Sequence, residues 1–306
     1  MANNAIKILV ILGPTASGKS DLAVRLAEKF NGEVVSADSR QVYRGLDIGT
    51  GKITLNEMRG IRHHCLDIAD PKERFTFEDW RKCAEEAIMD IHSRDKLSIV
   101  CGGTGYYISA LIDGIRFPEV ESDPDEQKCL ELKSAEELFT ELEKLDPHRA
   151  GMMTGNGESG NKRRMARAIL IARKLGAVPR QNADIGSRKY DALKIGITIP
   201  DPVLKERIRV RLESRIKTGM IEEAKKLHVE GLSFERMDEL GLEYRYLAQY
   251  IQGKINKEEM INVLTTKIWQ YARRQKTWWK KDAWIKWFVS EKIDEVAQEV
   301  ERFVRR

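Results

Sequence analysis

Paired cysteines are missing from this sequence. Its four cysteines, at positions 65, 83, 101 and 129, are widely spaced and form no C-x-x-C pair. This pattern predicts neither a zinc site nor a disulfide framework. We therefore expect reduced thiols, most of them packed in the interior.

Long apolar runs and targeting signals are missing too. No run approaches the roughly 20 apolar residues of a membrane span, and the first residues enter an apolar stretch without a signal-peptide pattern. The net charge of +5 over 306 residues is small, so a surface for a polyanion must come from local clusters. We expect a cytoplasmic protein, monomeric by default, with no membrane partner and with room for an α/β domain plus an insertion.

The sequence does contain a complete phosphate-binding motif, G-x-x-x-x-G-K-[ST]. Its eight residues are Gly13, Pro14, Thr15, Ala16, Ser17, Gly18, Lys19 and Ser20. An apolar strand over 6–12 precedes it and an amphipathic helix over 21–30 follows it, which is the context that such a loop requires. Backbone N–H groups of the loop surround a di- or triphosphate, Lys19 adds a positive charge, and the Ser20 hydroxyl ligates a phosphate-bound Mg²⁺. The motif predicts a nucleotide- or diphosphate-binding site that uses Mg²⁺.

Strands and helices alternate along most of the chain. Strand signals at 33–37, 97–101, 194–199 and 284–289 are separated by helical patterns. This order predicts an α/β fold with a P-loop NTPase-like parallel sheet and helices on both faces. Residues 116–184 contain helical patterns over 125–145 and 161–175, with a flexible loop at 151–160 between them. They predict an all-helical insertion domain within a catalytic core formed by 1–115 and 185–306.

Two strand ends supply candidate residues for chemistry. Asp38 follows the strand at 33–37, at the edge where doubly wound sheets bind ligands. It is a candidate general base or Mg²⁺ ligand, and a loop cap is the alternative. The strand at 97–101 runs into Gly102, Gly103 and Thr104, where an NTPase usually places an acid that helps to hold Mg²⁺. This departure disfavours motor, switch and ATPase functions, and it makes Thr104 a candidate contact in the cleft or a helix cap.

Basic residues form three groups. Arg207, Arg211 and Arg215 lie on one face of the helix after Pro202, so one of them can clamp a departing diphosphate if this face borders the loop. Otherwise the row is a solvated face. Residues 262–281 contain no acid, and their basic side chains alternate with tryptophan and tyrosine. The insertion carries the third group at 162–167. Such clusters predict RNA contacts, although some of the tryptophans are expected in the core.

Together these residues resemble the bacterial tRNA dimethylallyltransferase family, also called tRNA isopentenyltransferases or IPP transferases. The resemblance covers nearly the whole chain. It is carried by GPTASGKS, SADSRQVYRGLDIGTGK, HHCLDI, VCGGTGYY, RRMARA and the segment from Arg274 to Trp278. It implies transfer of a dimethylallyl group from dimethylallyl diphosphate to the exocyclic amine of the adenosine immediately 3′ of the anticodon in tRNA. In this family the phosphate loop holds the diphosphate of the prenyl donor and does not cleave a nucleotide.

The resemblance also implies residue roles. Asp38 would be the catalytic base, and Thr104 would be the second catalytic residue. The loop from Gly13 to Ser20 and Arg211 would bind the diphosphate, with Mg²⁺ on Ser20. The insertion would contact the anticodon stem-loop, and the implied tRNA-binding residues are Asp38, Ser39, Arg40, Gln41, Thr104, Arg163, Arg164, Met165, Ala166 and Arg167.

Some positions and functions stay open. His63 and His64 are adjacent, so at most one faces the cleft from an extended strand. Glu243 stands where relatives usually have glycine, which puts a tRNA contact by that segment in doubt. Three alternative functions remain: an isopentenyltransferase that acts on free adenine nucleotides, a P-loop small-molecule kinase, and a nucleotide-gated RNA-binding protein without turnover.

Overall fold

The computed structural model describes residues 5–113, 120, 124–155, 157, 159–179 and 189–306. The chain divides into two compact units, one formed by Met1–Asp113 with Ser187–Arg306 and the other by Gly114–Gly186. The domain boundaries predicted from the sequence, at 115/116 and 184/185, lie outside the described residues. We call the first unit the core and the second the helical unit.

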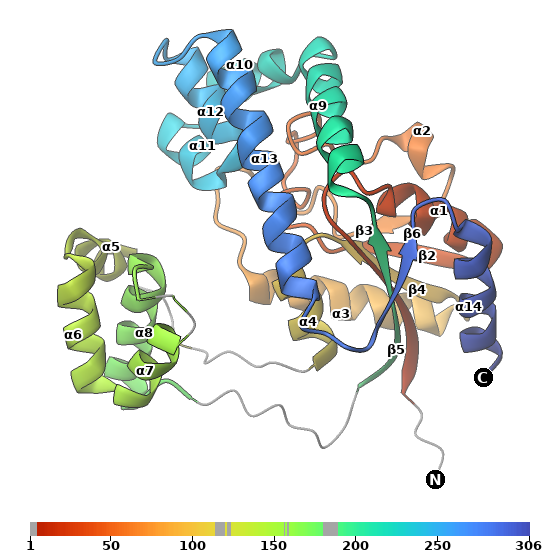
Figure 1. The fold of residues 1–306 in the computed structure, drawn as a ribbon, viewed down its shortest axis with the longest axis horizontal. Coiled ribbons are helices and arrows are strands. Elements are labelled where there is room, and N and C mark those ends of the chain that lie inside the picture. The colour runs from red at the N-terminus through yellow and green to blue at the C-terminus, as the bar shows by residue number, and fades with distance from the viewer. Residues whose placement is uncertain (1–4, 114–119, 121–123, 156, 158, 180–188) are drawn as a thin grey trace. The chain divides into compact units, whose positions relative to one another are not determined.

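The core is built on a six-stranded parallel sheet with the order β3-β2-β4-β1-β5-β6 (Figure 1). The strands are β1 (Ile6–Leu12), β2 (Gly32–Ser36), β3 (His63–His64), β4 (Leu97–Gly102), β5 (Tyr190–Thr198) and β6 (Ile285–Val289). The predicted parallel α/β fold is confirmed. Because all strands run in one direction, their carboxyl ends meet at one edge, which is where such sheets bind ligands.

Helices cover both faces of this sheet (Figure 1). Successive side chains of a strand point to opposite faces. Accordingly, Ile8 and Val10 of β1 belong to one apolar cluster, and Leu9 and Ile11 belong to the other. The second cluster includes side chains of α1 (Lys19–Lys29) and α14 (Ile293–Arg305). The first includes side chains of α3 (Phe77–Ser93), α4 (Gly105–Asp113), α9 (Asp201–Lys217) and α13 (Lys257–Trp279).

The shorter helices of the core are α2 (Leu55–Met58), α10 (Met220–Val229), α11 (Phe234–Leu240) and α12 (Leu242–Ile251). Among them, α10 packs against α9 and α12, α12 packs against α11 and α13, and α2 packs against α1. The sequence predicts one helix from Pro202 to about His228, and this prediction is wrong at Gly219. That glycine has a φ of +106°, a left-handed value that ends α9 and allows α10 to begin in a new direction.

The helical unit contains α5 (Pro124–Leu132), α6 (Ala135–Leu145), α7 (Pro147–Gly155) and α8 (Lys162–Leu175). The single helix predicted over 125–145 is two helices, because Ser134 and Glu137 form a capping box that starts α6. The flexible loop predicted at 151–160 is also partly wrong, since residues up to Gly155 belong to α7. Burial of Ala150 and Met153 in the unit's apolar core outweighs the helix-weakening glycines there.

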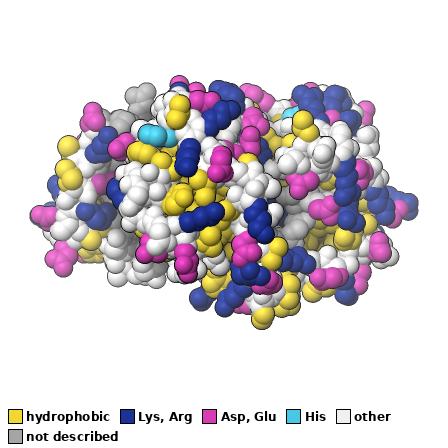
Figure 2. Space-filling view, turned by 90° about the horizontal axis from the view of Figure 1, so that it is seen from above, with side chains coloured by type: hydrophobic (Ala, Val, Ile, Leu, Met, Phe, Trp, Pro, Cys, Tyr) yellow, Lys and Arg dark blue, Asp and Glu magenta, His cyan; other side chains and the backbone are white. Residues whose placement is uncertain are grey.

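No helix in the described part of the chain has the length and apolar character needed to cross a membrane. Acidic and basic side chains are interspersed over the face of the molecule seen in Figure 2, with hydrophobic side chains between them. This mixture agrees with the small net charge of +5.

Candidate active site at the carboxyl edge of the sheet

The phosphate loop joins β1 to α1. Ala16 and Gly18 have φ values of +61° and +86°, and the Ser17 N–H donates to the Pro14 carbonyl at 3.2 Å, so the backbone turns tightly. Gly18 is the N-cap of α1 and carries no side chain that could cap the helix. The amides of the first turn are therefore available to an anion, as the motif predicts.

Lys19 contributes the positive charge of this loop. Its Nζ donates to the Pro14 carbonyl at 3.3 Å. Although the residue keeps some exposed surface, protein surrounds the ammonium group, and this burial lowers the pKa of Lys19. The thiol of Cys101 and the carboxylate of Asp38 oppose the shift in pKa, while Arg211 adds to it. Lys19 therefore lies within electrostatic reach of both Asp38 and Arg211, and a bound anion would restore a favourable environment for its charge.

Asp38 lies just past the end of β2 and is half-buried. Its Oδ1 accepts hydrogen bonds from the N–H groups of Arg40 at 2.9 Å and Gln41 at 3.4 Å. The loop cap that the sequence left open as an alternative is therefore present. This cap still allows Asp38 to act as a general base, because the described residues supply no hydrogen bond to its Oδ2. One oxygen fixes the carboxylate, and the other is available to a substrate.

Thr104 is brought next to Asp38 by the pairing of β2 with β4. Its Oγ1 accepts from the Ser39 N–H at 3.4 Å, and its own N–H donates to the Ala37 carbonyl at 3.4 Å. Tyr271 of α13 joins them: burial raises the pKa of Tyr271, the Asp38 carboxylate adds to this, and a hydrogen bond with Thr104 opposes it. Three polar side chains from distant segments thus meet at one edge.

Gln275 is a site residue that sequence reasoning missed. It is only 6% exposed. Its Oε1 accepts from the Thr15 N–H at 2.9 Å and its Nε2 donates to the Gly103 carbonyl at 2.8 Å, so it ties the phosphate loop to the loop after β4. A Cβ on Gly103 would lie 2.2 Å from that Nε2, which explains the glycine. In the sequence, Gln275 appears only as a member of the Arg274–Trp278 motif, and the resemblance assigns no role to it.

The row of three arginines on α9 does not act as one group. Arg207 pairs with Glu291 at 3.9 Å, whereas Arg211 and Arg215 donate to the carbonyls of Gly51 at 2.9 Å and Gly49 at 2.7 Å. Arg211 is therefore the member of the row that lies near Lys19 and Asp38. Desolvation, together with the neighbouring Arg215 charge, lowers the pKa of Arg211.

Glu243, the residue at which this chain departs from the usual glycine, has a structural partner. Its Oε1 accepts from both terminal nitrogens of Arg215 at 3.1 Å. Arg215 in turn holds the Gly49 carbonyl. The acid therefore stabilises the loop beside the site.

A small pocket beside the phosphate loop is lined in part by Ser20, Gln41 and His63. His63 lines it while His64 turns away and bonds Glu33 at 2.8 Å, as expected for neighbours on a strand. Ligand atoms of Glu33, His64 and Asp90 lie within 4.8 Å of one another. Arg94 and Lys96 already neutralise Glu33, so we assign no metal to that cluster.

The predicted RNA-binding residues of the helical unit lie on two faces of α8, one exposed and one buried. Arg163 and Arg164 are exposed, and Arg167 donates to the Val120 carbonyl at 2.7 Å. Met165 and Ala166 are fully buried in the unit's apolar core. A tRNA contact by these two side chains is therefore ruled out in this structure, because the 3.6-residue helical period turns them inward when the arginines turn outward.

The predicted basic and aromatic stretch on α13 also contains both exposed and buried side chains. Arg273, Arg274 and Trp278 are exposed, whereas Trp279 is 1% exposed and belongs to the core. Trp278 packs on Gly105, where a Cβ would lie 2.4 Å from its ring. The expectation that some of these tryptophans are structural holds for Trp279.

The loop, the strand ends and the cations together define a P-loop-type α/β protein with a candidate phosphate site at the carboxyl edge of its sheet. The chain belongs to the IPP transferase family, whose model matches residues 41–282. It is 40% identical over 274 residues to a protein of Geotalea uraniireducens named tRNA dimethylallyltransferase 1, covering 90% of this chain and 88% of the relative. It is 42% identical over 276 residues to tRNA dimethylallyltransferase 2 of Treponema denticola, covering 89% and 91%. The resemblance found in the sequence is confirmed.

Solved structures agree. A tRNA isopentenylpyrophosphate transferase from Bacillus halodurans matches with a TM-score of 0.72 at 36% identity, covering 96% of this chain and 95% of that one. A eukaryotic dimethylallyltransferase described as acting on tRNA matches with a TM-score of 0.79 at 28% identity, covering 94% and 74%. The fold is that of the tRNA isopentenyltransferases.

Proposed function

We propose that this protein transfers a dimethylallyl group from dimethylallyl diphosphate to the exocyclic amine of the adenosine immediately 3′ of the anticodon in tRNA. Family membership supports the reaction class, since relatives that cover about nine-tenths of the chain are named tRNA dimethylallyltransferase. The structural observation that carries the proposal is the meeting of three features at one sheet edge: the phosphate loop with Lys19 after β1, Asp38 after β2, and Arg211 held on the Gly51 carbonyl.

In the proposed reaction the bond between the allylic carbon and a diphosphate oxygen breaks, and the electron pair leaves with the diphosphate. Negative charge grows on the leaving oxygens, where Lys19, the loop amides and Arg211 stabilise it. The amine nitrogen forms the new bond to carbon and loses a proton, which Asp38 accepts through Oδ2. Because an aromatic amine is a weak nucleophile, a positioned base contributes about 10²- to 10⁴-fold.

Mg²⁺ fits the residues at the start of α1. The Ser20 side chain is exposed on the first helical turn, beside the amides that would surround the diphosphate. One protein hydroxyl together with phosphate oxygens and water matches the octahedral oxygen coordination that Mg²⁺ prefers. When bound, the ion would neutralise charge on the diphosphate. Ser20 is the protein ligand we propose for it.

The tRNA contacts are proposed for Asp38 to Gln41 and Thr104 at the sheet edge, and for the arginines of α8. The exposed Arg273, Arg274 and Trp278 of α13 add cations and an aromatic plane of the kinds that bind phosphates and unpaired bases. The target adenine must leave its stack for its amine to reach Asp38.

We expect the reaction to take place in the cytoplasm and the enzyme to act as a monomer.

Incubation with labelled dimethylallyl diphosphate tests this proposal. Unmodified tRNA, AMP and ATP are offered as separate acceptors, and label in tRNA alone is the expected result. Label in AMP would select the isopentenyltransferase of free nucleotides, and phosphate transfer from ATP would select the kinase. RNA affinity without any product would leave a binding protein and would refute the transferase.

A further inference from the structure

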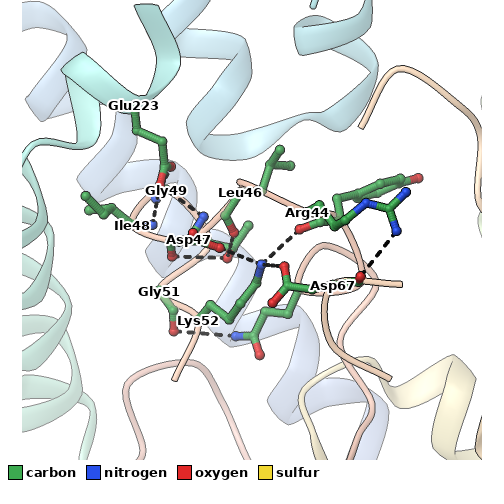
Figure 3. A network of polar contacts seen from close by, with 12 residues as sticks. Arg44, Leu46, Asp47, Ile48, Gly49, Gly51, Lys52, Asp67 and Glu223 are labelled. Atoms are coloured by element: carbon green, nitrogen blue, oxygen red, sulfur yellow. Dashed lines mark hydrogen bonds and ion pairs between the residues drawn. The ribbon is translucent and has the colours of Figure 1, made fainter. Parts of the chain in front are cut away.

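The loop formed by residues 47–52, here called the 47–52 loop, is anchored at its carboxyl end by a buried lysine (Figure 3). Lys52 is 9% exposed, and its Nζ donates to the Tyr43 carbonyl at 2.9 Å. The same ammonium group pairs with Asp47 at 2.6 Å and with Asp67. A buried charge is tolerated when carboxylates and carbonyls surround it in this way. This end of the loop therefore has a fixed position.

Glu223 of α10 anchors the other end of the 47–52 loop (Figure 3). Its Oε2 accepts from the N–H groups of Asp47 at 3.0 Å and Ile48 at 2.7 Å. Its Oε1 accepts from the Gly49 N–H at 2.8 Å and from the Tyr244 hydroxyl at 2.7 Å. Hydrogen bonds to an ionised carboxylate are about twice as strong as neutral ones. One side chain thus fixes three successive amides.

The same anchoring decides where the loop's carbonyls lie. With its amides on Glu223, the loop offers the Gly49 carbonyl to Arg215 and the Gly51 carbonyl to Arg211, at 2.7 and 2.9 Å. Neither glycine has room for a side chain. A Cβ on Gly49 would lie 2.6 Å from the Tyr244 hydroxyl, and one on Gly51 would lie 2.6 Å from the Arg211 guanidinium.

We propose that Glu223 is a positioning residue for Arg211: through the 47–52 loop it places the Gly51 carbonyl so that the Arg211 guanidinium is directed at the diphosphate pocket. Within the described residues, the Gly51 carbonyl occupies one terminal nitrogen of Arg211, and the other donors of the guanidinium are open to the ligand. A long side chain held in advance loses less conformational freedom on binding. This role rests on the proposed function for its biological meaning, but pyrophosphate binding tests it without prenyl transfer.

Calorimetric titration with pyrophosphate and Mg²⁺ should be compared in the wild type, Glu223→Gln, Arg211→Ala and the double variant. Glutamine has nearly the size of glutamate, but its NH₂ group cannot accept the hydrogen bonds that one carboxylate oxygen accepts. We expect Glu223→Gln to weaken binding about tenfold, within the range that small misplacements of binding groups cause. Because the effect passes through Arg211, the double variant should bind within about twofold of Arg211→Ala alone.

Glu222→Gln is the matched control, since it makes the same change on the same helix at an exposed side chain, and it should bind as the wild type does. Tyr244→Phe removes one of the four hydrogen bonds to Glu223 and should weaken binding by about two- to threefold. If Glu223→Gln does not fold, Tyr244→Phe in the Arg211→Ala background replaces it in the comparison.

Two results would overturn the proposal: wild-type affinity in the Glu223 or Tyr244 variant, or losses that multiply in the double variant. The second would mean that Glu223 acts on the pocket by a route other than Arg211. Coupled losses in a protein that fails to prenylate tRNA would refute the proposed function and leave the positioning role supported.

Discussion

The sheet edge of the core and helix α8 of the helical unit are both predicted to bind phosphates, yet they are built differently. At the sheet edge, polar groups are fixed by other polar groups: Gln275 holds the phosphate loop, and a loop carbonyl holds Arg211. On α8, Arg163 and Arg164 project from a helix whose other face is apolar core. The first construction suits charge stabilisation, which needs fixed donors. The second suits contacts to a polyanion backbone, where charge and exposure matter most.

The largest effect is expected at Asp38, on the fixed side of this comparison. Asp38→Asn keeps an oxygen that can accept from Arg40 and Gln41, but it removes the base. We expect single-turnover prenylation of saturating tRNA to fall about 10²- to 10⁴-fold. The tRNA dissociation constant, measured by filter binding, should rise far less, because Asp38 is only one of the proposed tRNA contacts. An equal loss of both would reassign Asp38 from catalysis to binding.

The next largest effect concerns stability in the helical unit. Met165 is fully buried, so Met165→Ala should lower the free energy of unfolding of this unit by about 2–5 kcal/mol through the lost contacts and the cavity left behind. Urea unfolding followed by circular dichroism measures this loss. Below the unfolding transition, tRNA affinity should stay at the wild-type value. A stable Met165→Ala variant with weak tRNA binding would restore Met165 to the contact surface.

A smaller effect is expected from the exposed side of α8. Replacing both Arg163 and Arg164 with glutamine should weaken tRNA binding roughly tenfold at low salt, and it should reduce the slope of log affinity against log salt by about 1.5 to 2. The rate at saturating tRNA should remain unchanged. Replacing Lys128 and Lys144, two exposed lysines of the same unit, with glutamine removes the same charge and is the matched control. If both pairs weaken binding equally, α8 has no special role.

The smallest effect is a pH dependence at the phosphate loop. Burial lowers the pKa of Lys19 from its ordinary value of 10.5. The ammonium group is charged below its pKa and neutral above it, so pyrophosphate affinity should fall as the pH rises, beginning earlier than for an exposed lysine. Lys19→Arg stays protonated and should remove this decline. Comparing the two proteins cancels the ionisation of pyrophosphate itself, and identical pH profiles would refute the assignment.

Short-range patterns in the sequence predicted much of the fold. The phosphate loop, the strand before it, the helix after it and the position of Asp38 after β2 all follow from spacings of a few residues. Longer helical segments were predicted less well. The capping box at Ser134 and the left-handed Gly219 each divided a predicted helix, because a single cap or backbone angle outweighs an uninterrupted apolar pattern.

By itself, the sequence determined the class of fold, the phosphate loop and the family, because these depend on residue types at short, fixed spacings. Only the tertiary structure decided which side chains support the site. Thr15 and Gln275 are 260 positions apart, and Gly49 and Glu223 are 174 apart. It also decided that Arg211 rather than Arg207 lies near Lys19, and that Met165 faces inward. Such pairings depend on how whole helices pack on the sheet, and no local pattern of residues encodes that packing.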